Sequence, residues 1–134
     1  MTKYVFDTSA LLAYIENEAG ANTVEDLLQK AMDGKATILI SVISLIELFY
    51  IIVQEQSKEI AYERIELTKE LPITIIGLEE ADIEIIALLK AKYQISFADS
   101  CIAGLAKLKD AELVHKDPEY EDVPLKQKKL PYKK

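Results

Sequence analysis

Four acidic residues stand out because each adjoins an apolar segment of the chain. Asp7 and Asp117 come shortly after short apolar runs. Glu47 is the only charge in the segment ISLIELFYIIV, and Asp99 precedes a run of small and apolar residues. Carboxylates without cysteine or histidine partners are hard oxygen donors, which select Mg²⁺ or Mn²⁺ over zinc or copper. Such an ion offsets the charge of a phosphate and activates water to attack it. If the fold brings the four acids together, we expect divalent-metal chemistry on a phosphate ester.

Glu47 lies in a segment whose every helical face is apolar, which predicts a buried helix. An unpaired buried carboxylate is costly, so this one would be protonated, paired with a cation or bound to a metal. The chain contains a single arginine, Arg64, so guanidinium partners are scarce. The alternative is a glutamate at a helix edge that reaches solvent.

The other three acids have ordinary structural explanations as well. Ser96 to Asp99 fits a capping box, in which Ser96 caps a helix and Asp99 is the reciprocal group. Asp7 would serve as the N-cap of a following helix. Asp117 precedes Pro118 and would start a turn. Capping does not exclude metal binding, and the coincidence of four such acids favours a shared site.

The elements that must position these acids alternate along the chain. Short apolar strands separated by helices are typical of a parallel sheet covered on both faces. We therefore expect an α/β fold, a three-layer α/β/α sandwich with a short-stranded, mainly parallel sheet. Ligands bind such sheets at the carboxyl ends of the strands, where Asp7 and Asp117 would lie. The expected strands are 4–6, 37–41, 73–76, 112–114 and 123–125. Four expected helices are 10–16, 57–70, 79–93 and 97–109. Two more are expected, one that is capped by Asn22 or Thr23 and ends at 33, and one that runs from Ser41 or Ser44 to 54.

The length and charge of the chain limit its organisation. The 134 residues fit one domain, predicted as residues 1–125 and followed by a lysine-rich C-terminal tail, 126–134, with five lysines and no acid. With 16 basic and 23 acidic residues the net charge is −7, which argues against holding nucleic acid by a general basic surface. An anionic partner would need a bound cation, a local lysine cluster or the tail.

The single cysteine and the lack of long apolar segments suggest where the protein works. Cys101 excludes an internal disulfide and a cysteine-based zinc site, and this favours a reducing cytoplasm. An acid occurs within seven residues of the start, unlike in a secretory signal. The most apolar run, 42–53, is too short to span a bilayer and contains Glu47. The expectation is a soluble, cytoplasmic protein.

The four acids and their neighbours resemble the PIN domain, and the small size resembles the VapC-type toxins of toxin–antitoxin pairs. The resemblance covers nearly the whole chain. No single motif is specific, but all of them in this order and within this length make a strong signal. The matching segments are Val5–Ser9, an acid followed by hydroxyl residues; Ser44–Leu48, a glutamate in an apolar helix; Ser96–Ala106, an aspartate opening a helix of small residues; and Leu113–Asp117, an aspartate after a late strand.

This resemblance implies a metal-dependent endoribonuclease that hydrolyses phosphodiester bonds of single-stranded RNA. Asp7, Glu47, Asp99 and Asp117 would be the catalytic residues and would hold one or two Mg²⁺ or Mn²⁺ ions. Ser9 would orient the first acid or a metal-bound water. The resemblance also implies a homodimer and a small antitoxin partner that inhibits the site, often by placing a basic side chain among the acids. The short apolar runs noted above add the expectation of no membrane association.

One residue departs from the pattern of the family. Two residues before the fourth acid the family often has Thr or Ser, where this chain has its only histidine, His115. His115 is either a polar residue at a strand edge or a contact to phosphate or the leaving group near neutral pH. The fourth acid also varies in the family, so Glu119, Glu121 and Asp122 are substitutes for Asp117.

Two other functions compete with the nuclease. Receiver domains and haloacid-type phosphatases also place acids at strand ends. Such a phosphatase requires Asp-x-Asp after the first strand, where this chain has Ser9, and a receiver requires an aspartate after the third strand, where Gly77 and Leu78 stand. The remaining alternative is a non-catalytic PIN-like module that binds RNA or a protein, and the presence of all four acids argues against it.

Overall fold

The computed structural model describes residues 1–131; Tyr132, Lys133 and Lys134 of the expected tail lie outside the described residues. Over residues 1–131 the chain alternates strands with helices, as expected. The strands are β1 (Thr2–Phe6), β2 (Ala36–Ser41), β3 (Thr74–Ile76), β4 (Glu112–His115) and β5 (Gln127–Lys129). The α-helices are α1 (Thr8–Ile15), α2 (Ala21–Met32), α3 (Val42–Glu55), α4 (Lys58–Lys69), α5 (Ile83–Lys92) and α6 (Phe97–Leu108), and the 3₁₀ turns are η1 (Glu80–Asp82) and η2 (Pro118–Tyr120).

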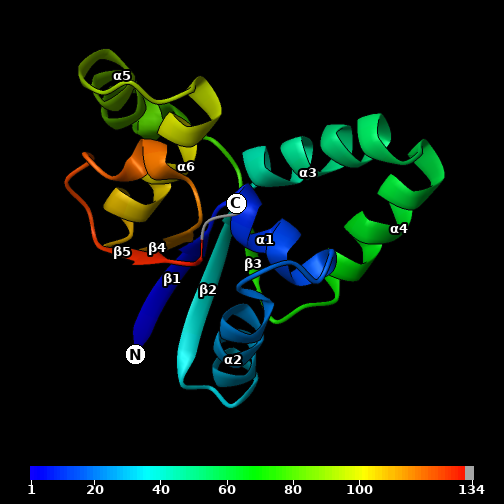
Figure 1. Ribbon diagram of the computed structural model, residues 1–134. Helices are drawn as coiled ribbons and strands as arrows, with labels where there is room; N and C mark the ends of the chain where they lie inside the picture. The colour runs from blue at the N-terminus through cyan, green and yellow to red at the C-terminus, as the bar shows by residue number, and fades with distance from the viewer. Residues whose placement is uncertain (132–134) are drawn as a thin grey trace.

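The strands form one sheet in the order β3-β2-β1-β4-β5, and every neighbouring pair runs parallel (Figure 1). Successive side chains of a strand point to opposite faces, and β1 shows how the two faces are filled. Tyr4 and Phe6 pack in the core beneath α1 to α4, whereas Val5 packs in the core beneath α5 and α6. The expected three-layer α/β/α sandwich is confirmed.

The helices divide between the two faces in a way that creates a crevice. The connections from β1 to β2 and from β2 to β3 use α1 to α4 on one face, and the connection from β3 to β4 uses α5 and α6 on the other. The direction of winding therefore reverses between the neighbouring strands β1 and β4. At such a switch point the loops diverge at the carboxyl ends of the strands and leave room for a ligand.

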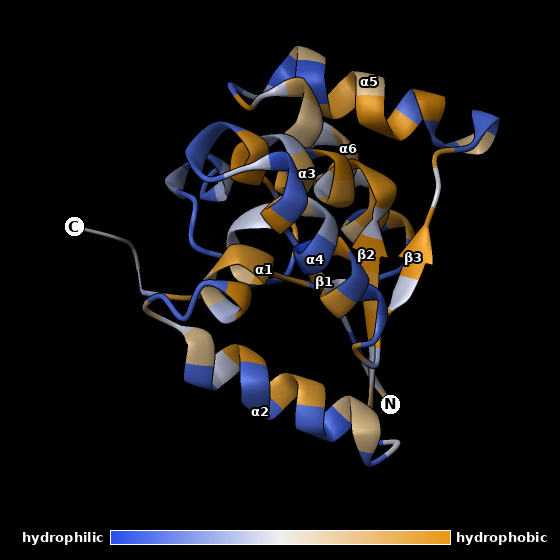
Figure 2. Cartoon of the chain, turned by 90° about the vertical axis from the view of Figure 1, so that its right-hand side faces the viewer, coloured by the Kyte–Doolittle hydropathy of each residue, from blue (hydrophilic) through white to orange (hydrophobic). Residues whose placement is uncertain are grey.

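The hydropathy of the outer helices fits this layering. In Figure 2, α2 carries hydrophilic and hydrophobic residues in alternation, whereas β2 is mostly hydrophobic. Val24, Leu27 and Leu28 are the buried residues of α2, at the spacing of one helical face. Among residues 1–131, no helix is long and apolar enough to cross a membrane.

The predicted fifth strand and the predicted tail are both wrong for the residues described. Val123 to Leu125 form no strand, and β5 is instead the polar segment Gln127–Lys129, which pairs with β4. Leu130 follows it into the core, where only 3% of its surface is exposed. The lysine-rich segment therefore belongs to the folded domain as far as Leu130. Backbone pairing with β4 and the burial of the Leu130 side chain hold it there.

Two predicted helix starts also differ from the structure. The helix α2 begins at Ala21 with Gly20 as its N-cap, not Asn22 or Thr23. Gly20 has φ +97°, a conformation that glycine adopts without the strain that other residues incur, and it allows a tight turn out of α1. The expected helix 79–93 opens as the 3₁₀ turn η1 and becomes α-helical only from Ile83.

Candidate active site

The acids predicted from the sequence gather at the carboxyl ends of β1 and β4. Asp7 follows the last residue of β1, and Asp117 lies two residues beyond β4. Asp99 is in the first turn of α6, and Glu47 is in α3. The charges of Asp117 and Glu47 both act on Asp7, and those of Asp7 and Asp117 act on Asp99. The four acids therefore share one electrostatic environment at the switch point of the sheet.

The tightest group of acids contains two of the four predicted residues and one of the named substitutes. One carboxylate oxygen from each of Asp99, Asp117 and Glu119 lies within 4.8 Å of the others. Asp117 caps η2 by accepting the backbone N–H of Glu119 at 2.9 Å, so the turn that the Asp-Pro sequence predicts also sets Glu119 beside it. Asp7 and Glu47 lie outside this group of three.

Asp7 is buried and held from two sides. Only 3% of its surface is exposed, and its Oδ1 accepts the Ser9 hydroxyl at 2.6 Å and the Ala10 N–H at 2.9 Å. Its backbone N–H donates to the carbonyl of Val114 in β4 at 3.1 Å. Burial raises the pKa of Asp7 to about 7, against the lowering effect of those two hydrogen bonds. Asp7 is thus the N-cap of α1 and also a carboxylate whose charge is poorly solvated.

Glu47 is half-buried, and the prediction that α3 is buried on every face is wrong. Ile46, Tyr50 and Val53 form an exposed apolar side of the helix. Glu47 lies beside this stripe, where Oε1 accepts the Thr8 hydroxyl at 2.6 Å and Oε2 accepts the Tyr50 hydroxyl at 3.3 Å. Thr8 follows Asp7 directly, so this bond ties α3 to the first acid.

Asp99 does not act as the reciprocal group of a capping box. Ser96 caps α6 as predicted, with its hydroxyl accepting the Asp99 N–H at 3.0 Å. The Ser96 N–H, however, donates to Glu119 Oε1 at 3.3 Å, and Asp99 Oδ1 instead accepts the buried Tyr120 hydroxyl at 2.9 Å. In a capping box the Asp99 carboxylate would accept the Ser96 N–H, but Glu119 accepts it instead. The Asp99 carboxylate lies with the other acids.

The protonation of Asp99 reflects its burial and its acidic neighbours. Burial is the main reason that the pKa of Asp99 rises to about 8. A hydrogen bond with Glu119 and the charge of Asp117 add to the rise, and the hydrogen bond from Tyr120 opposes it. Asp99 therefore holds a proton near neutral pH when no cation is present. Burial and the charges of Asp7 and Asp99 also raise the pKa of Tyr120 well above its usual range, so its hydroxyl stays a donor.

His115 is fully buried, and the prediction of a phosphate or leaving-group contact is wrong. Its Nδ1 accepts the Asp117 N–H at 3.0 Å, and its Nε2 lies 2.9 Å from Gln127 Oε1. Because Nδ1 is an acceptor, the ring proton resides on Nε2 and is donated to Gln127. Burial lowers the pKa of His115, which keeps the imidazole neutral. His115 therefore holds the backbone of the Asp117 turn.

Within residues 1–131, no cationic side chain pairs with these acids. Lys116 lies between His115 and Asp117 in sequence, but its Nζ donates to the carbonyl of Ala19 at 2.9 Å and lies 3.8 Å from Glu18. Over residues 1–131, no lysine or arginine forms an ion pair with Asp7, Glu47, Asp99, Asp117 or Glu119. Oxygen donors of like charge without a protein counter-ion fit a hard divalent cation such as Mg²⁺ or Mn²⁺.

Ser9 joins the two strand ends that carry the acids. Its hydroxyl donates to Asp7 and accepts the backbone N–H of Lys116 at 3.0 Å. Ser9→Ala should lower the free energy of unfolding by about 1–3 kcal/mol, because the Lys116 N–H loses its acceptor. Urea unfolding in EDTA measures this loss. Ser9→Thr keeps the hydroxyl and serves as the control, and equal stability of the Ala variant and the wild type would contradict the bridge.

Sequence reasoning missed four residues that contact the site: Thr8, Tyr50, Tyr120 and Gln127. A hydroxyl directly after the first acid was a usable signal for Thr8, and the spacing of three residues from Glu47 on one helix was a usable signal for Tyr50. Tyr120 and Gln127 carry no such signal, because their roles depend on pairing between α6, η2 and β5. Of the substitutes for Asp117, Glu119 joins the acid group, whereas Glu121 lies 3.6 Å from Lys129 in an ion pair.

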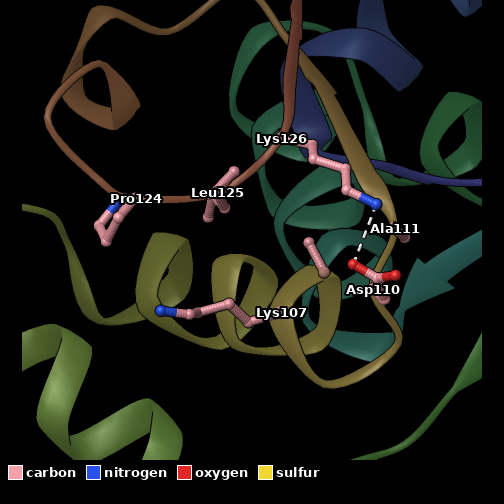
Figure 3. A pocket seen from close by; sticks show the side chains of 7 residues that line it. Lys107, Asp110, Ala111, Pro124, Leu125 and Lys126 are labelled. Carbon is pink, nitrogen blue, oxygen red and sulfur yellow. Dashed lines mark ion pairs between the residues drawn. The ribbon is translucent and has the colours of Figure 1, made fainter.

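A separate hollow of about 450 Å³ lies near the starts of β4 and β5, at the amino ends of the strands. It is lined by residues of α6, of the turn between α6 and β4, and of the segment before β5, and none of the acids at the carboxyl ends of the strands lines it. Figure 3 shows Lys126 directed at Asp110 across it, with Nζ 3.0 Å from Oδ1. Parallel strands place this hollow at the opposite end of the sheet from the acid group.

Comparison with known families identifies the chain. The family model described as "PIN domain" matches residues 4–126. The chain belongs to the PIN domain family. The match to this family thus spans nearly all of the residues that the structure describes, and it includes the four predicted acids. A comparison with curated proteins found no significant match.

Solved structures share the fold of this PIN domain. VapBC2 from Rickettsia felis, bound to a promoter DNA fragment, matches with a TM-score of 0.77 and 23% identity over 97% of this chain and 100% of that chain. DNA-bound VapBC from Salmonella typhimurium matches with a TM-score of 0.79 and 19% identity, over 96% and 98%. VapC20 from Mycobacterium tuberculosis, described as a toxin that cleaves the sarcin-ricin loop, matches with a TM-score of 0.73 and 13% identity, over 91% and 95%. At these identities the likeness concerns the fold.

Proposed function

We propose that this PIN domain is a metal-dependent endoribonuclease that hydrolyses phosphodiester bonds of single-stranded RNA. The observation that carries the proposal is the convergence of Asp99, Asp117 and Glu119 within 4.8 Å at the switch point of the sheet, beside the buried Asp7. Three carboxylates this close repel one another unless they bind protons or a cation. The net charge of −7 also leaves RNA binding dependent on a cation at this site.

The donor set fits Mg²⁺ or Mn²⁺. Asp99, Asp117 and Glu119 would hold one ion, and Asp7 and Glu47 would complete the site or hold a second. When bound, the cation supplies positive charge for the phosphate and a water activated for attack. Ser9 orients Asp7 through the 2.6 Å hydrogen bond, and Thr8 orients Glu47 in the same way. Asp99 must release its proton before it can bind a cation, since metal ligands are deprotonated.

The same proposal includes a role as the toxin of a toxin–antitoxin pair. Several structural matches are described as toxin–antitoxin proteins, among them a toxin–antitoxin complex from Klebsiella pneumoniae and VapBC-5 from Mycobacterium tuberculosis. The exposed apolar side of α3, with Ile46, Tyr50 and Val53, is the kind of surface that a protein partner covers. We propose a small antitoxin and a homodimer on the same basis, and the single cysteine, Cys101, favours a cytoplasmic location.

Removing the metal tests the nuclease directly. Purified protein with Mn²⁺ or Mg²⁺ should cleave a single-stranded RNA of mixed sequence, and excess EDTA should abolish cleavage, because the acid group then lacks the charge that phosphate requires. Gel analysis of end-labelled RNA measures the products. Returning Mn²⁺ in excess over EDTA is the control and should restore cleavage. Intact RNA under every metal condition, together with no heat of Mn²⁺ binding, would overturn the proposal.

The toxin role has its own test, which is growth. Induced expression in a host without the antitoxin should arrest growth, and Asp117→Asn at equal expression should relieve the arrest. Unimpaired growth with the wild-type chain, when the purified protein does cleave RNA, would contradict the toxin role and leave the nuclease standing.

A further inference from the structure

Behind the acid group lie three polar side chains that are not candidate metal ligands. Tyr120 and His115 are completely buried, and Gln127 in β5 is half-buried. Their rings and amide are in mutual contact: the centroids of His115 and Tyr120 are 4.7 Å apart, and His115 bonds to Gln127. We call these three residues the Gln127–His115–Tyr120 network.

The side chain of Gln127 makes three hydrogen bonds. Its Nε2 donates to the carbonyls of Tyr120 at 2.9 Å and Val123 at 3.1 Å, and its Oε1 accepts His115 Nε2 at 2.9 Å. One side chain on the outermost strand thus fixes both the end of η2 and the orientation of the imidazole. A buried polar group with all partners in place holds its neighbours rigidly, whereas a missing partner is costly.

The other ends of the network reach two different acids. His115 Nδ1 accepts the backbone N–H of Asp117 at 3.0 Å. The Tyr120 hydroxyl donates to Asp99 Oδ1 at 2.9 Å. Asp117 and Asp99 come from different elements, the turn after β4 and the start of α6. The network therefore links the two acids through hydrogen bonds and through the ring contact of His115 with Tyr120, and it approaches them from the protein interior.

We propose that the Gln127–His115–Tyr120 network positions Asp99 and Asp117 at the spacing that a divalent cation requires, with Tyr120 as the positioning residue for Asp99. The inference rests on the proposed metal-dependent function. Without a cation, the carboxylates of the acid group repel one another and tend to separate. Hydrogen bonds from non-ligand residues fix the orientation of metal ligands, and losing one typically weakens metal binding by about 10- to 100-fold.

Tyr120→Phe tests the network by removing one oxygen and keeping the buried ring. Calorimetry should show Mn²⁺ binding weakened by about tenfold or more. RNA cleavage should need a correspondingly higher Mn²⁺ concentration for half-maximal rate and should recover at saturating Mn²⁺. A role in stability alone would lower the unfolding temperature without moving the metal midpoint. The matched control is Tyr4→Phe, because Tyr4 is also buried and lies in β1 away from the acid group; this variant should bind Mn²⁺ like the wild type.

A second measurement needs no metal and no activity. In the EDTA-treated protein, Gln127→Leu should speed hydrogen exchange of the Asp117 amide by about tenfold or more, because the imidazole that accepts this N–H is released. Amides of β1 and β2 serve as the internal reference and should exchange as in the wild type. Unchanged exchange at Asp117 would overturn the proposed network whatever the metal experiments give.

The two proposals fail in different ways. If the wild-type protein binds Mn²⁺ and Tyr120→Phe binds it equally well, the positioning role of Tyr120 is wrong and the nuclease stands. If the wild-type protein binds no Mn²⁺, the proposed function is wrong, and with it the role of the network towards a cation.

Discussion

Asp7→Asn should raise the free energy of unfolding of the metal-free protein more at pH 8 than at pH 5. The difference between the effects of the substitution at the two pH values should be about 3 kcal/mol. The folded pKa of about 7 lies above the value of about 3.9 in an unfolded chain. Between these values the folded state holds a proton that the unfolded state has lost, so the free energy of unfolding falls as pH rises from about 4 to about 7. Asparagine has no charge to bury and keeps an oxygen for Ser9 and Ala10. Urea unfolding in EDTA at pH 5 and pH 8 measures the difference.

The control for this experiment is Asp26→Asn, because Asp26 is exposed on α2 and should leave the pH dependence unchanged. The result that would contradict the prediction is an Asp7→Asn variant with the same fall in stability from pH 5 to pH 8 as the wild type. The same variant should lose RNA cleavage under the proposed function. A substitution that stabilises the fold and removes activity is what a functional carboxylate in a poorly solvated position predicts.

Asp99→Asn should weaken Mn²⁺ binding and slow RNA cleavage by about 10²-fold or more. Asp99 is the buried member of the acid group, and the loss of a direct ligand should exceed the 10- to 100-fold that outer partners of metal ligands contribute. Asparagine keeps the oxygen that accepts the Tyr120 hydroxyl, so the local fold should survive. Calorimetry and single-turnover cleavage at fixed Mn²⁺ measure the two effects.

Asp110→Asn is the matched control for Asp99→Asn. Asp110 pairs with Lys126 at the amino end of the sheet (Figure 3), and 85% of its side chain is exposed. This variant should bind Mn²⁺ and cleave RNA like the wild type. Cleavage by Asp99→Asn at the wild-type rate would exclude Asp99 from the metal site, even if the protein proves to be a nuclease.

The strands that build the site were predictable because burial on both faces leaves a continuous apolar run. Residues 4–6 and 37–41 are such runs, and the structure confirms both as strands. The segment Gln127–Lys129 is polar, so nothing local predicts β5. It is an edge strand held by pairing to β4 and by Leu130, and these contacts exist only in the folded chain.

The acids of the site were predictable as a set because a parallel sheet collects residues from separate strand ends. Which of these acids lie closest together could not be predicted from the sequence. A capping box assigned the Asp99 carboxylate to Ser96 on local spacing, yet Glu119 takes the Ser96 N–H. For His115 the sequence left open a polar residue at a strand edge or a contact to phosphate near neutral pH, and the structure buries it between Asp117 and Gln127. Local spacing cannot reveal partners that β5 and η2 supply from a distance.

The central position of β1 has a consequence for how the protein folds. β1 pairs with β2 and with β4, and the register with β4 joins Tyr4 to Glu112, near opposite ends of the chain. Contacts between distant residues form slowly because a long loop must close first. The half of the sheet with β1, β2 and the helices α1 to α4 involves shorter loops, so it should form early and the switch point late. Changes in the acid group would then alter the rate of unfolding far more than the rate of folding, and the lifetime of the native chain would depend on whether a cation is bound.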